Sequence, residues 1–169
     1  MPTQTRTEPT VKTFEQAETL LQELYESALE RRREFEGLRN RAEQMVRSIK
    51  AANEKADEQL EAYREFLLDG EPAKADSALD AVGKHRHEAK GLREELGKLL
   101  ADIDPLKKAV EDIRLGGGAV SESKILLDIE HRLKLAYGLI GQVADSCGHT
   151  GVELNNLRDF IERHAKKPE

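Results

Sequence analysis

The chain has 169 residues and a net charge of −6, with 36% charged residues, 4% aromatic residues and no Trp. This acidic balance is atypical of proteins that bind nucleic acid or anionic membranes, because both attract clustered basic side chains. The single cysteine, Cys147, excludes an intramolecular disulfide. Strong helix formers dominate and no alternating run of β-branched residues indicates a strand, so we expect an all-α protein.

The first residues, MPTQTRTEPTVK, have the composition of a flexible polar tail, which we place at residues 1–12. They lack the apolar stretch of a secretory signal. No window of the sequence approaches the roughly 18 apolar residues that a membrane span requires. We therefore expect a cytoplasmic protein without a membrane partner, folded as one helical domain over residues 13–169.

The first predicted helix covers residues 14–69. It begins after Thr13, whose hydroxyl can form a capping box with Gln16, and it ends at the breaker sequence DGEP. Apolar residues recur at the first and fourth positions of each heptad, called a and d, from Phe14 to Phe66. That spacing is typical of a coiled coil.

The second predicted helix covers residues 73–115 and keeps one a/d seam throughout. Pro105 interrupts the helical hydrogen bonds without changing the phase of the seam, so we expect a kink near residue 105. The triplet Gly116, Gly117 and Gly118 favours non-helical backbone and is predicted to end this helix in a turn.

The third predicted helix covers residues 122–165, with its seam running from Leu126 to His164. Gly148 and Gly151 flank a possible break, but the seam keeps its phase across them. We therefore expect either one helix bent near residues 148–151 or two coaxial helices.

These three helices predict an elongated antiparallel three-helix coiled-coil bundle, because short connections make successive helices antiparallel. The DGEP turn places Ile49 opposite Leu92. The glycine turn places Leu92 opposite Cys147, and its helix would reach back to the level of Ala75.

In this register the amino-terminal end of the first helix overhangs the bundle, since Leu24 falls level with Gly117. Burying one Leu or Phe is worth roughly 1.5–3 kcal/mol, so an exposed apolar strip of this kind indicates an interaction surface. Intramolecular cover by the tail or by the AVSES segment, or a bend of the helix, is the alternative. The candidate partner-binding residues are Phe14, Ala17, Leu20, Leu21, Leu24 and Tyr25.

The sequence contains no motif that predicts catalytic, cofactor-binding or metal-binding residues. None of the five His follows a Glu by three residues, so the helical di-iron signature is absent. Cys147 and His149 provide too few ligands for a structural zinc site, and the glycine triplet follows no strand. We therefore expect a protein that is not an enzyme and needs no cofactor.

Charge is unevenly distributed along the first two helices. Residues 31–50 contain seven basic and three acidic side chains, whereas residues 53–80 contain nine acidic and three basic ones. Such a dipolar rod can associate head to middle or present its acidic tip to a basic partner, although an ordinary solvated surface explains the same pattern.

The expected function is therefore a protein–protein interaction module, such as an adaptor, assembly factor or inhibitor, that binds a partner protein through coiled-coil surfaces. The alternative is a structural subunit whose copies assemble through the overhang into an oligomer or filament. The predicted shape is similar to coiled-coil stalks and export chaperones of bacterial secretion systems and to small phage-encoded inhibitors and assembly factors. A likeness of shape alone does not imply function.

Overall fold

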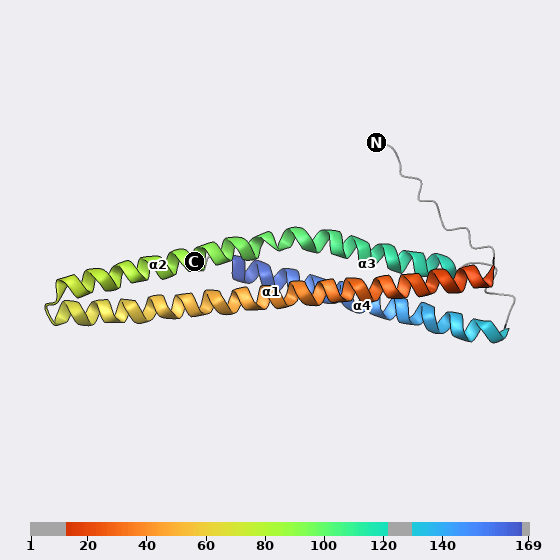
Figure 1. Cartoon of the computed structure of the whole chain (residues 1–169), viewed down its shortest axis with the longest axis horizontal. Helices are drawn as coiled ribbons and strands as arrows, with labels where there is room; N and C mark the ends of the chain where they lie inside the picture. Colours follow the sequence, from red (N-terminus) through yellow and green to blue (C-terminus); the bar gives the residue numbers. More distant parts are fainter. Residues whose placement is uncertain (1–12, 122–129, 167–169) are drawn as a thin grey trace, which may run out of the picture. The chain divides into compact units, whose positions relative to one another are not determined.

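The computed structural model describes residues 13–121 and 130–166, and these residues are almost entirely helical (Figure 1). No strand occurs among the described residues, which confirms the all-α prediction and the packing of helix against helix. The helices are α1 (Phe14–Leu68), α2 (Pro72–Lys98), α3 (Leu100–Ser121) and α4 (Glu130–Ala165).

The chain divides into two compact units, and α1 and α4 each contribute to both. Unit 1 comprises Met1–Glu36 and Asp104–Asn155, of which the described residues are the first part of α1, most of α3 and most of α4. Unit 2 comprises Gly37–Ile103 and Asn156–Glu169, with the rest of α1, all of α2 and the last turns of α4.

The amino terminus of α1 is capped as the sequence predicts. The backbone N–H of Gln16 donates a hydrogen bond to the Thr13 hydroxyl oxygen at 3.2 Å, which satisfies one of the donors that a helix start leaves without a partner. The predicted tail at residues 1–12 lies outside the described residues.

In unit 2, α1 and α2 form an antiparallel hairpin, whose turn is built by Gly70 and Pro72 (Figure 1). Gly70 has φ +72°, a left-handed conformation that costs glycine little. Its N–H donates to the carbonyl of Leu67, and the N–H of Glu71 donates to the carbonyl of Phe66, as in a Schellman motif. Pro72 then starts α2 at a position where its missing N–H is not needed.

The break in the second predicted helix lies at Leu99, six residues before the proline. Leu99 N–H donates to the carbonyl of Leu96, and Asp102 N–H donates to that of Leu99, both spaced three residues apart instead of four. Pro105 itself lies inside α3. Pro105 lacks an N–H, and its ring crowds the carbonyl of Ala101, so the strain that a proline introduces falls on its amino-terminal side, the side on which Leu99 lies.

The predicted turn at the glycine triplet is wrong, because α3 continues through it to Ser121. A Cβ placed on Gly116 would lie 3.3 Å from Leu24 Cδ2, and one on Gly117 would lie 3.2 Å from Val143 Cγ1. Both residues are therefore packed against neighbouring helices within unit 1. The glycines allow close packing here, and they do not end the helix.

The longer α3 also changes the register of α4. The predicted pairing of Leu92 with Cys147 would place Val143 level with Leu96, but Val143 contacts Gly117 instead. The difference of 21 residues is three whole heptads, so the same apolar seam stays buried in both registers. In unit 2, Ala165 accordingly lies against Gly97, and α4 does not reach the level of Ala75.

The third predicted helix has no break at residues 148–151, which are helical within α4. Thr150 is buried there, and its hydroxyl donates to the carbonyl of Ser146 at 2.8 Å. This internal bond satisfies a polar group in mid-helix without interrupting the helix. The predicted start at residue 122 falls outside the described residues.

Gly118→Ala tests whether the triplet is helical. A Cβ on Gly118 would meet nothing within 4 Å, so the substitution should raise the free energy of unfolding by about 0.5–1 kcal/mol through better helix propensity. Urea denaturation followed by circular dichroism measures the change. A loss of stability would show that this position needs glycine-only backbone, as in the predicted turn.

Candidate protein-interaction surface

Two of the six predicted partner-binding residues are fully buried within the chain. Ala17 and Leu21 form a core cluster with Val120, and Leu139 and Ile140 of α4 pack against it. Because α3 runs past the glycine triplet, its last turn covers the part of α1 that was expected to overhang. The exposure predicted for Ala17 and Leu21 is therefore wrong, and intramolecular cover is correct at these positions.

The other candidates are less exposed than an overhang implies. Leu20, Leu24 and Tyr25 are partly buried. Leu20 packs against the same core cluster, and Leu24 packs against Gly116. The side chain of Phe14 lies outside the described residues. These residues thus belong mainly to the interior of unit 1.

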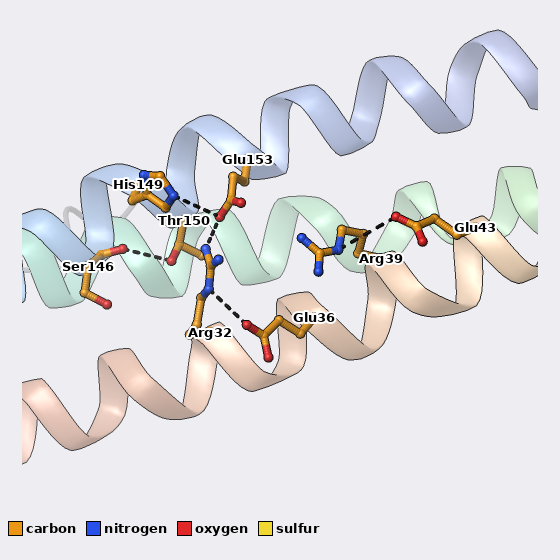
Figure 2. A network of polar contacts seen from close by, with 8 residues as sticks. All are labelled: Arg32, Glu36, Arg39, Glu43, Ser146, His149, Thr150 and Glu153. Carbon is orange, nitrogen blue, oxygen red and sulfur yellow. Dashed lines mark hydrogen bonds and ion pairs between the residues drawn. The ribbon is translucent and has the colours of Figure 1, made fainter.

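A half-buried polar network joins α1 to α4 in unit 1 (Figure 2). The Arg32 guanidinium donates to the Glu153 carboxylate through one nitrogen, and its Nε lies 3.3 Å from Glu36 Oε1. His149 Nε2 is 3.8 Å from Glu153 on the following turn of α4. Arg32 and Glu153 are each about one quarter exposed, so the pair fixes the alignment of the two helices more than a solvated pair would.

The groups considered for metal or redox chemistry are not assembled into a site. Cys147 is buried, and desolvation raises the pKa of its thiol, which disfavours the reactive thiolate. Within residues 13–121 and 130–166, no three His, Cys, Asp or Glu side chains are grouped to hold a metal ion. The polar chemistry of these residues is that of ion pairs along and between helices.

A groove opens in unit 2 beside the carboxyl end of α4. The groove has a volume of about 490 Å³. Val46 and Ile49 supply apolar surface, while Arg93, Arg163 and Lys166 supply positive charge. The groove marks the place where α4 ends and the α1–α2 hairpin continues without it.

The groove shows which face of the hairpin α4 covers. Val46 and Asn53 of α1 and Arg93 of α2 all line it, and all three occupy heptad position e, directly beside the a/d seam. In an antiparallel pair the e positions of both helices lie on one side. Ala165 packs on Gly97 at that side. The last turns of α4 therefore lie over the e side of the hairpin.

Beyond α4 the e side continues with apolar residues, and we call this surface the open face. Leu67 is 52% exposed, Leu79 is 46% exposed, and Leu60 is partly buried. Within the part of the chain that the structure describes, no helix lies over them, and Figure 1 shows only α1 and α2 along this stretch. The open face comprises Asn53, Leu60 and Leu67 of α1 and Leu79, Gly83 and Arg86 of α2.

The hairpin beneath the open face is held together by small side chains. Its buried seam consists mainly of Ala52, Ala56, Ala75, Ala78, Val82 and Ala89. Each alanine buries little area, so the seam contributes less stability per residue than a leucine seam. The large apolar side chains of this segment lie on the open face or near the turn instead.

The sequence contains a signal for the open face outside heptad positions a and d. Leu60 and Leu67 are spaced by seven residues at position e, outside the seam, and Leu79 occupies the same position on α2. Apolar residues at e widen the buried stripe beyond what two helices can cover. The a/d pattern alone does not include these apolar residues at position e.

No family model, curated protein or solved structure matches the chain. None of the described helices combines the length and the hydropathy that crossing a bilayer requires.

Proposed function

We propose that the chain is a non-enzymatic protein–protein interaction module that binds another protein chain through the open face. One observation carries the proposal: the side of the hairpin that α4 covers continues past Ala165 with Leu67 and Leu79 exposed and Leu60 partly buried. A helix laid along this track would bury these side chains as α4 buries the preceding ones. Helix-in-groove binding of this kind uses anchors at helical spacing.

The size of the apolar surplus supports binding at this surface. Complete burial of one Leu contributes roughly 1.5–3 kcal/mol, and about half of Leu67 and Leu79 remains to be buried. Adaptors, assembly factors and inhibitors of enzymes all act through surfaces of this type, without a catalytic group.

A photoreactive amino acid at Leu79 tests the proposal directly. Irradiation in extract from the source cells should yield a discrete covalent adduct, identified by mass spectrometry, because Leu79 lies within the proposed interface. The matched control places the same amino acid at Glu58, an exposed residue at heptad position c on the other side of α1. Equal labelling from both positions, or none from Leu79, would overturn the proposal.

A further inference from the structure

The half of the α1–α2 hairpin next to the turn accounts for the net charge of the protein. Residues 53–80 contain nine acidic and three basic side chains, and the rest of the chain contains 24 of each sign. Near the turn the acidic residues include Asp69, Glu71 and Asp76. Arg64 and Lys74 are the basic residues there, and Lys74 pairs with Glu71, so the turn end of the hairpin is anionic on balance.

The other end of the open face, at the end of α4, carries the opposite charge. The basic residues that line the groove there are Lys50, Arg93, Arg163 and Lys166. The acidic residues that line it are Glu54 and Asp57, and His164 lines it as well. Along one surface the potential therefore changes sign from the turn to α4. A surface with this polarity is complementary to a copy of itself turned end over end.

We propose that the occupant of the open face is a second copy of this chain, packed antiparallel about a two-fold axis at Leu60. The inference rests on the proposed function, and it names the partner that the face binds. The two hairpins then form a four-helix bundle in which each α1 lies over α1 of the second copy and each α2 over α2. Every neighbouring pair of helices is antiparallel.

An axis at Leu60 fixes the opposing residues. Leu60 meets Leu60 of the second copy, and Leu79 comes level with Gly83 of the second copy. Asp76 comes level with Arg86 of the second copy. The turn of each hairpin stops beside Lys50 of the other, just short of the end of its α4, so the two fit without collision.

Gly83 has a counterpart that is already covered within the chain. Gly97 lies two heptads further along α2, and there Ala165 of α4 packs beside it: a Cβ on Gly97 would lie 3.8 Å from the Cβ of Ala165, an ordinary van der Waals contact. A Cβ on Gly83 would meet nothing within 4 Å. Glycine in mid-helix lowers helix stability, so its presence at position 83 needs a reason. In the proposed dimer, Leu79 of the second copy packs over Gly83, where a larger side chain would not fit.

The opposite orientation is disfavoured by charge. A parallel pair would bring the two anionic turns together and the two cationic grooves together, and like charges in contact are destabilising. The antiparallel pair is also a closed assembly, because each copy covers the open face of the other and no open face remains for a third copy. It therefore gives a dimer and no filament.

Sedimentation equilibrium over a range of protein concentrations tests the assembly. The full chain should sediment as twice its 19.0 kDa monomer mass. Leu60→Glu combined with Leu79→Glu should raise the dimer dissociation constant at least about 100-fold, since each copy loses two apolar contacts. Leu115→Glu is the matched control: Leu115 is 39% exposed on α3 in unit 1 and is not part of the open face, so its variant should dimerise normally.

A pair of glycine variants separates the interface from helix stability. Gly83→Leu should raise the dissociation constant at least about 10-fold, because the larger side chain fills the space that Leu79 of the second copy needs. Gly91→Leu should leave it unchanged, since Gly91 lies at position c, on the far side of α2. Both variants should retain their helix content by circular dichroism.

Disulfide crosslinking in a Cys147→Ser background fixes the axis. Leu60→Cys should give a covalent dimer on mild oxidation, whereas Glu58→Cys should give little. Ile49→Cys with Leu92→Cys should crosslink within one chain, because both lie in the seam of the same hairpin. If the cysteines at positions 49 and 92 crosslinked only between chains, the two copies would have exchanged their α1 or α2 helices. That result would overturn the proposed arrangement.

The outcomes distinguish this inference from the proposed function. A wild-type chain that stays monomeric at high concentration overturns the second copy as occupant, and so does a dimer that Leu60→Glu with Leu79→Glu leaves intact. If the photoreactive residue at Leu79 then labels a different protein, the proposed function stands and only the partner is wrong. If it labels neither itself nor another protein, both fail.

Discussion

Leu21→Ala is expected to lower the free energy of unfolding by about 2–5 kcal/mol, the range for removing a buried leucine side chain from a packed core. Leu21 is fully buried against Ala17 and Val120, so the cost falls on folding of the single chain. Urea denaturation at several protein concentrations measures it. The loss should be the same at every concentration, because the contacts are intramolecular.

Leu68→Ala is the matched control for this effect. Leu68 belongs to the same helix but is 88% exposed, so its truncation should change stability by no more than about 0.5 kcal/mol. If Leu21→Ala instead left the monomer's stability unchanged and abolished an association, the amino-terminal part of α1 would be a partner surface after all.

Phe35→Ala should destabilise the protein by about 3–5 kcal/mol, as expected for loss of a buried aromatic ring. Phe35 is among the largest fully buried side chains, and the guanidinium carbon of Arg32 lies 5.2 Å from its ring centroid. Phe66→Ala is the comparison: that ring is only partly buried near the turn, so its loss should cost less. Differential scanning calorimetry measures both variants.

The same calorimetry tests the prediction of a single domain. Phe35 belongs to unit 1 and Phe66 to unit 2, while α1 runs through both without a break. We expect one cooperative transition that shifts as a whole in either variant, because unfolding one unit would expose the apolar face of a helix shared with the other. Two transitions, of which Phe35→Ala moved only one, would mean two independent domains.

The helices that carry a local signal could be predicted from the sequence. The start of α1 depends on Thr13 and Gln16, and its end depends on Gly70 and Pro72, which act over a few residues. The a/d seam could also be predicted. Heptad spacing indicates which side chains of a helix are buried, and this does not depend on which helix packs against them. Ala52, Ala56 and the other seam residues of the hairpin are buried accordingly.

The end of α3 could not be predicted, because glycine has two roles that a single sequence does not separate. It favours turns, and it also allows close packing of helices. Gly116 and Gly117 have the second role, which depends on Leu24 and Val143 being opposite them. That information is tertiary, and the predicted partner surface at the start of α1 was wrong at Ala17 and Leu21 for the same reason.

The open face was missed for a different reason. Whether Leu67 and Leu79 are covered depends on where α4 ends along the hairpin, and this follows from the register of α4. Once α4 is shifted by three heptads, the surplus of apolar residues at position e has no cover. Sequence spacing shows the surplus, but the position of the third helix decides whether it is surface or core.

The Arg32–Glu153 pair has a consequence for how one alignment is selected from many. Apolar seams shifted by one heptad bury nearly the same area, so leucines and alanines alone leave several alignments close in free energy. Moving α4 by one heptad would set the half-buried guanidinium against Ser146 or Phe160 instead of a carboxylate. Arg32 would keep Glu36 of its own helix but lose its only ion pair to α4 among the described residues, which disfavours the shifted alignment. The few half-buried polar pairs therefore favour one alignment of the helices. The many apolar contacts hold the helices together in any alignment that keeps the heptad phase.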